Sequence, residues 1–97
     1  MFDRILRRMR ELVRADKYVV TVHGRQEMVA DRLTVFDVER CFLTGAIIER
    51  QKDRRTGEWK YVVEGETVSG LKAVAVSKIA PTKKLAIITV YLKAPKS

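Results

Sequence analysis

The first half of the chain repeats apolar residues at helical spacing. A first amphipathic helix is predicted near the amino terminus, and its apolar positions are Phe2, Ile5, Leu6, Met9, Leu12 and Val13. Thr21 is placed to cap a second helix over about residues 23–31. Thr34 and Asp37 approximate a capping box for a third helix, which Gly45 is placed to end.

After Gly45 the apolar residues follow a strand pattern instead. The expected strands are residues 46–51, 58–64, 71–79 and 84–92. Residues 18–22 indicate a short extended or turn-like segment, and Gly65 and Gly70 indicate an ordinary loop between strands. Short connections favour an antiparallel meander. We therefore expect one α+β domain over residues 1–97, with the N-terminal helices packed on one face of a four-stranded antiparallel meander.

Alternation along the strands assigns side chains to faces. In the last strand, Leu85, Ile87, Thr89 and Tyr91 are expected to share one face. Thr89 and Tyr91 would then either reach a phosphate or form hydrogen bonds within the core. Lys60 is expected on the wetter face of the second strand of the meander.

The positive charge of the chain indicates which classes of partner it could bind. The net charge is +8 and the sequence pI is near 10.0, and residues 67–97 contain six lysines and no acid. Nucleic acid, an acidic protein or an anionic membrane surface would suit such a chain. The first helix is therefore either an RNA-binding or membrane-surface helix, or a core-packed helix with a solvated basic face, and the sequence favours the second.

Several classes of protein are not expected. The longest nearly apolar stretch, residues 85–92, is far too short for a transmembrane helix, and the amino terminus does not resemble a secretory signal. Cys41 is the single cysteine and is expected to be a buried small hydrophobe. A cytoplasmic address is predicted. There is no phosphate-binding glycine loop and no paired cysteines, so no cofactor is expected.

His23, Glu27 and Asp31 are spaced to form a stripe on one face of the second helix. The stripe has three interpretations: a general acid or base oriented by Glu27, a divalent-cation site, or a solvated helix face with a local His–Glu pair. The spacing is generic for a metal site, and no metal is predicted. Lys60, Arg32, Arg54 and Arg55 are candidates to bind a phosphate.

The order and spacing of several short motifs resemble a known family, domain of unknown function 4258. The matching positions are His23, Glu27-Met28, Asp31, Leu33-Thr34, Asp37-Val38, Thr44-Gly45, Gly57 to Tyr61, Gly65 and Ile87 to Tyr91. The resemblance covers about residues 18–92. Many relatives carry arginine where Glu27 and Asp31 stand, so the chain resembles an acidic sub-branch.

The resemblance implies a RelE- and barnase-like small toxin fold, similar in layout to the motility quorum-sensing regulator toxin. It implies a type II toxin–antitoxin module whose toxin is an mRNA interferase. The partners would be RNA, which could be ribosome-associated mRNA, and a cognate antitoxin, which could carry a zinc-binding domain with CxxC motifs.

Carried onto this sequence, the resemblance implies metal-independent cleavage of RNA by attack of the ribose 2′-hydroxyl. His23 would be the general base or acid, oriented by Glu27, and Lys60 would stabilise the charged phosphorane. Tyr91, with Thr89, would contact the phosphate or complete proton transfer. The alternative is a non-enzymatic basic module that binds nucleic acid or a protein.

Overall fold

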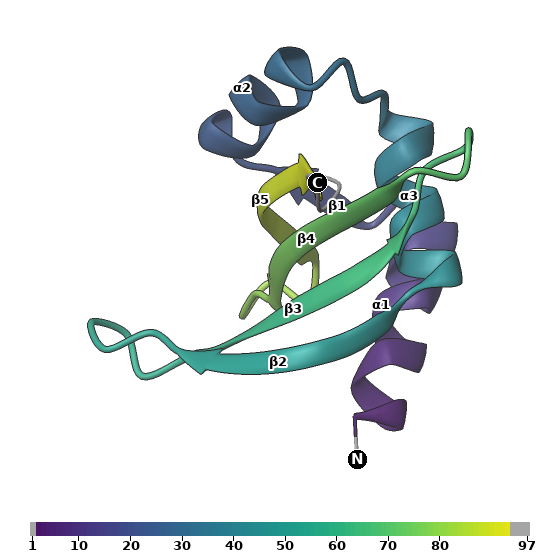
Figure 1. Ribbon diagram of the computed structural model, residues 1–97. Coiled ribbons are helices and arrows are strands. Elements are labelled where there is room, and N and C mark those ends of the chain that lie inside the picture. The colour runs from purple at the N-terminus through teal and green to yellow at the C-terminus, as the bar shows by residue number, and fades with distance from the viewer. Residues whose placement is uncertain (1, 94–97) are drawn as a thin grey trace.

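Three helices and five strands form in the part of the chain that the computed structural model describes, residues 2–93 (Figure 1). The helices are α1 (Asp3–Arg14), α2 (Val22–Ala30) and α3 (Val35–Thr44). The strands are β1 (Tyr18–Val20), β2 (Ala46–Lys52), β3 (Trp59–Glu66), β4 (Lys72–Ile79) and β5 (Leu85–Leu92). Of these elements, β1 was expected only as an extended or turn-like segment.

The predicted helix caps are confirmed. The Thr21 hydroxyl accepts a hydrogen bond from the Gly24 backbone at the start of α2, and Thr34 and Asp37 form a reciprocal capping box on α3. α1 buries Met9, Leu12 and Val13 and is therefore packed on the core, as the sequence favoured. Among residues 2–93, no helix combines the length and the apolar character needed to span a membrane.

The sheet has five strands and is mixed, which corrects the predicted four-stranded antiparallel meander. Its order is β1-β5-β4-β3-β2, and β2 to β5 form the predicted meander. β1 adds a parallel strand, with Tyr18 opposite Leu85 and Val20 opposite Ile87. Three residues carry too little alternation to predict a strand, and β1 depends on its long-range partner.

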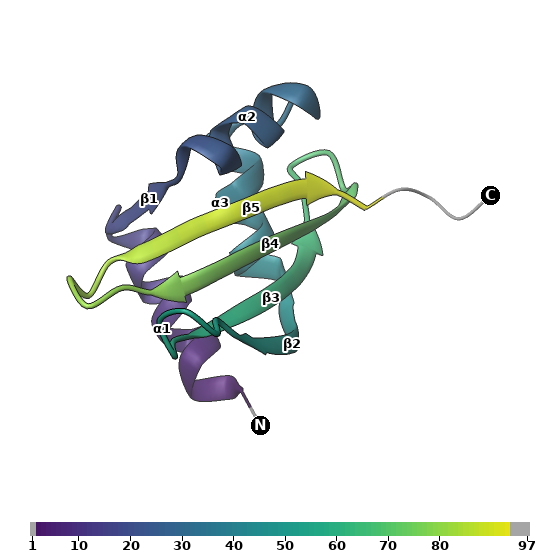
Figure 2. The ribbon, with the colours of Figure 1, turned by 90° about the vertical axis from the view of Figure 1, so that its left-hand side faces the viewer.

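Two layers result (Figure 2). α1 and α3 cover one face of the sheet, and Figure 2 shows the other face, which we call the open face. The core lies between the layers, and its largest fully buried side chains are Phe42, Met9, Leu12, Leu85, Ile87, Val38, Val63 and Val90. Cys41 is also buried there, and burial raises the pKa of its thiol to about 11, as expected for an inert residue.

A β-bulge in β5 overturns the predicted faces of that strand. Ser77 of β4 pairs with Ile87, whereas the preceding Val76 pairs with Thr89, so Ile88 is an extra residue. Past the bulge the alternation is inverted. Val90 therefore joins the core. Thr89 and Tyr91 lie on the open face, whereas Leu85 and Ile87 point into the core.

Gly65 lies within β3 rather than in the predicted loop. It is buried beneath α3, and a Cβ atom built on it would lie 2.1 Å from the Cys41 carbonyl oxygen. Backbone of α3 thus touches backbone of β3, which only glycine permits.

Gly65→Ala should destabilise the fold strongly, because the clash is with backbone that cannot move without shifting α3. We expect a loss of about 2–4 kcal/mol in the free energy of unfolding, measured by urea denaturation. Gly57→Asn is the control: Gly57 has φ +75 and nothing within 4 Å of a built Cβ, and asparagine tolerates this conformation. Equal losses for both variants would contradict the close contact.

Asp37 should give α3 a stability that depends on pH. Its carboxylate accepts hydrogen bonds from the Thr34 backbone at 2.9 Å and from the Val68 backbone at 3.0 Å. The Thr34 bond is the main cause of a pKa lowered from 3.8. Stability from this group is present above pH 3.8 and is lost as pH falls through the lower native pKa.

Asp37→Ala should therefore cost about 1 kcal/mol at pH 7, with the deficit shrinking toward pH 2. Denaturant titrations of both proteins between these pH values measure the difference. A deficit that stays constant with pH would show that the charge of Asp37 is unimportant.

Candidate functional site

Helix α2 lies along the edge of β5 and continues the edge protection that β1 begins. The Thr21 backbone donates to the Ile87 carbonyl at 3.0 Å, and the Thr21 hydroxyl donates to the Ile88 carbonyl at 2.9 Å. A Cβ on Gly24 would lie 3.2 and 3.3 Å from the same two oxygens. The first turn of α2 is therefore seated directly on the bulge.

Asp31 closes the other end of this edge. One Asp31 carboxylate oxygen accepts a hydrogen bond from the Leu92 backbone at 2.8 Å. Asp31, the last residue of the predicted stripe, is therefore engaged in a hydrogen bond to the sheet. Only His23 and Glu27 remain available for chemistry.

Helical geometry places His23 and Glu27 on the open-face side of α2. Gly24 and Asp31 lie on the line that meets β5, and Met28, on one side of that line, packs on the core. Glu27 and then His23 lie on the opposite side, because successive residues rotate by about 100° around the helix axis. This is the side to which Thr89 and Tyr91 point.

His23 and Glu27 form a pair suited to proton transfer. The distance from His23 Nε2 to Glu27 Oε1 is 3.3 Å, which makes an ion pair when the imidazole is protonated. The His23 side chain is 66% exposed and Glu27 27% exposed. Glu27 Oε1 is shielded from solvent and has no hydrogen-bond partner within the described residues. The carboxylate is therefore oriented toward the imidazole, and the imidazole toward solvent.

Tyr91 and two lysines lie on the neighbouring part of the open face. Tyr91 is 38% exposed, and its register partner Val74 lies opposite Glu64. Glu64 binds Lys93 at 3.1 Å and Lys72 at 3.9 Å. Neither lysine was predicted from the sequence as a site residue. Lys93 continues the alternation of Thr89 and Tyr91, which could have identified it.

Lys60 does not lie beside this group, although it is on the open face as predicted. It lies two strands and four residues away from Tyr91, so their Cα atoms are about 16 Å apart by strand geometry. Both side chains would have to lie fully extended along the sheet to share one phosphate.

The predicted phosphate-binding arginines are also spread out. Arg54 and Arg55 are at the tip of the β2–β3 hairpin, which Figure 1 shows pointing away from α2. Arg32 is exposed in the turn after α2, with a left-handed φ of 56. It follows Asp31 directly and is the one predicted arginine at the β5 end of the sheet.

This edge can therefore supply an imidazole, a phenol, a hydroxyl and ammonium groups, which is the chemistry of acid–base catalysis on a phosphate ester. Within residues 2–93, no group of three or more His, Cys, Asp or Glu side chains is arranged to hold a metal ion.

A family model, Domain of unknown function (DUF4258), matches residues 20–92. The chain belongs to this family. The match confirms the resemblance based on His23, the hairpin around Lys60 and the closing strand, and it leaves α1 outside the matched residues. No significant match was found among curated proteins or among solved structures. All candidate residues of this DUF4258 chain lie within the matched part, apart from Lys93.

Asp31→Ala should release the end of α2 from β5. Losing a charged acceptor for a half-buried backbone donor should cost about 1–3 kcal/mol in the free energy of unfolding. Asp31→Asn keeps an acceptor oxygen and should lose less than half as much. Amide hydrogen exchange at Leu92 provides a second measurement, and unchanged protection in Asp31→Ala would contradict the role of Asp31 at this edge.

Proposed function

We propose that this DUF4258 protein is an endoribonuclease whose active site lies where α2 meets the open face of β5. The observation that carries the proposal is the solvent-facing His23 imidazole, paired at 3.3 Å with a shielded Glu27 oxygen on the side of α2 that faces Tyr91. The charge of +8 favours a polyanionic substrate.

In the proposed reaction, His23 removes the proton of a ribose 2′-hydroxyl, whose oxygen attacks the adjacent phosphorus. The P–O5′ bond breaks, and the leaving oxygen takes a proton from the imidazolium or the Tyr91 hydroxyl. The products are a 2′,3′-cyclic phosphate and a 5′-hydroxyl. Glu27 orients the imidazole and stabilises its charged form.

Lys93 and Lys72 are better placed than Lys60 to stabilise the phosphorane. Both bind Glu64, which lies in the register row of Tyr91, whereas Lys60 lies four residues from Glu64 along β3. Thr89, half-buried on the same face, completes the phosphate contacts.

The resemblance extends the proposal to a RelE-like toxin of a type II toxin–antitoxin module, acting in the cytoplasm on mRNA and held inactive by an antitoxin. The helices-then-meander order supports this relationship at the level of layout. A non-enzymatic nucleic-acid-binding module is the second candidate, and the distance of Lys60 from Tyr91 favours it.

Expression from a tight inducible promoter in bacteria, with transcriptome-wide mapping of new RNA 5′ ends, tests the proposal. The parent should arrest growth and create new 5′-hydroxyl ends. His23→Ala should lower cleavage by purified protein about 100- to 10,000-fold, because it removes the general base.

Lys84→Ala is the matched control: it removes an exposed charge from the β4–β5 turn and should cleave like the parent. The cleavage rates of Tyr91→Phe and Lys93→Ala should lie between that of His23→Ala and that of the parent. If the parent creates no new RNA 5′ ends, or if His23→Ala creates as many as the parent, the endoribonuclease proposal fails and the non-enzymatic binding module takes its place.

A further inference from the structure

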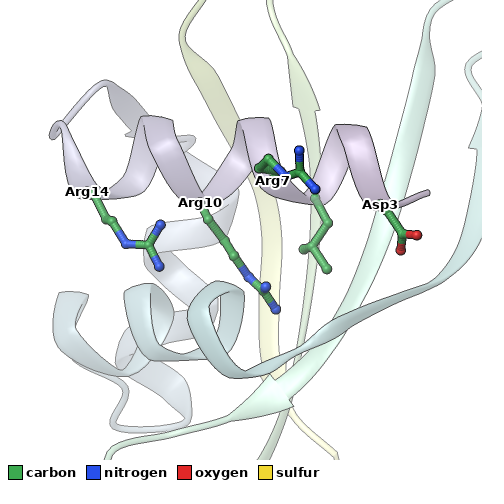
Figure 3. Close-up of a pocket in the computed structure, with 5 residues that line it drawn as sticks. Asp3, Arg7, Arg10 and Arg14 are labelled. Carbon is green, nitrogen blue, oxygen red and sulfur yellow. The ribbon is translucent and has the colours of Figure 1, made fainter.

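One flank of α1 carries three arginines. Arg7, Arg10 and Arg14 line a hollow of about 330 Å³ together with Asp3 and Leu6. Figure 3 shows Arg10 and Arg14 extending to the same side of the helix, with Arg7 lying across its front. This flank lies outside the family match and far from the proposed active site, since α1 packs on the opposite sheet face from Tyr91.

Arg10 holds the centre of the flank in place. Its Nε donates to the Phe42 carbonyl at 3.0 Å and its Nη2 donates to the Gly45 carbonyl at 2.8 Å, at the end of α3. Arg7 and Arg14 are exposed on either side, and within the described residues neither belongs to an ion pair. They are about 10 Å apart along the helix axis. The guanidinium groups of Arg7 and Arg14 are thus free of ion pairs within the described residues, on either side of the hydrogen-bonded Arg10.

Strand β2 connects this flank to an exposed aromatic cluster. β2 begins directly after Gly45, beside Arg10, and continues to Arg50 and Lys52. The Arg50 guanidinium lies 3.9 Å from the Trp59 ring centroid and 6.0 Å from that of Phe2, which directly precedes α1. Trp59 is 40% exposed. The edge strand β2 therefore connects the three arginines to Trp59, whose ring is in contact with the Arg50 and Lys52 side chains.

We propose that Arg7, Arg10, Arg14, Arg50 and Trp59 form a binding surface for single-stranded RNA, here named the α1–β2 surface. Guanidinium groups neutralise successive phosphates, and a base stacks on the accessible part of Trp59. Such a combination binds single strands without sequence preference. An acidic protein segment would use the arginines and leave the indole unused.

The inference builds on the proposed function by giving the enzyme an anchoring surface for its substrate. Because this surface is on the other side of the sheet from His23, one short oligonucleotide cannot occupy both. The α1–β2 surface therefore binds a flanking segment of a longer RNA and leaves cleavage of very short substrates unaffected.

Trp59 is the single tryptophan, so its fluorescence reports this surface directly. We would titrate the full chain with a 2′-O-methyl oligouridine 12-mer, which lacks the attacking hydroxyl and cannot be cleaved. Saturable quenching is expected, with an affinity that falls steeply with salt. If the 12-mer does not quench Trp59, whereas labelled polyglutamate of matched charge binds the chain by anisotropy, the surface belongs to an acidic protein and the proposal is overturned.

Arg7→Gln/Arg14→Gln and Arg4→Gln/Arg8→Gln remove equal charge from two sides of the same helix. The first pair should weaken binding of the 12-mer about tenfold or more, and lower the salt slope by about 1.4, at about 0.7 per phosphate contact. The second pair should weaken binding about threefold or less. Equal losses would mean a diffuse charge effect and would overturn the proposal.

Trp59→Leu tests the stacking contact, with binding measured by anisotropy of a labelled 12-mer. A loss of about fivefold or more is expected, and an unchanged affinity would overturn the stacking role. Lys84→Ala should bind the 12-mer like the parent, because it lies outside the surface and outside the proposed active site. Binding without any cleavage would refute the endoribonuclease while leaving the RNA surface intact, and cleavage without this binding would do the reverse.

Discussion

The structure depends on how β5 satisfies its outer edge. β5 pairs with β4 on one side, and its other side would leave backbone groups unpaired. β1 pairs with the first three residues, and α2 then protects the remainder through Thr21 at the bulge and Asp31 at Leu92. This closure sets the position of α2. The same contacts that complete the sheet therefore bring His23 beside the open face.

Local sequence signals predicted most of the fold. Hydrophobic periodicity located α1, and the hydroxyl caps at Thr21 and Thr34 located α2 and α3. These features depend on residues within four positions of one another. β1 was expected only as an extended or turn-like segment, because a three-residue strand is stabilised by its partner far along the chain. Gly65 was wrongly assigned to a loop, because only the packing of α3 shows why this position must lack a side chain.

The candidate site was only partly predictable for the same reason. His23 and Glu27 are one helical turn apart, so their pairing followed from spacing. Which strand residues join them depends on the bulge at Ile88 and on strand register. Uninterrupted alternation placed Tyr91 with Leu85, and the sequence could not show that Lys60 lies far from the register row of Tyr91 whereas Lys72 and Lys93 bind Glu64 within that row.

The position of α1 also bears on what counts as a domain here. Met9 and Leu12 are fully buried in the same core as Phe42 and Ile87, yet they lie before the residues that the family shares. A fragment limited to residues 20–92 would expose the apolar surface that α1 covers and would lose most of β1. The unit of folding is therefore larger than the unit of family resemblance.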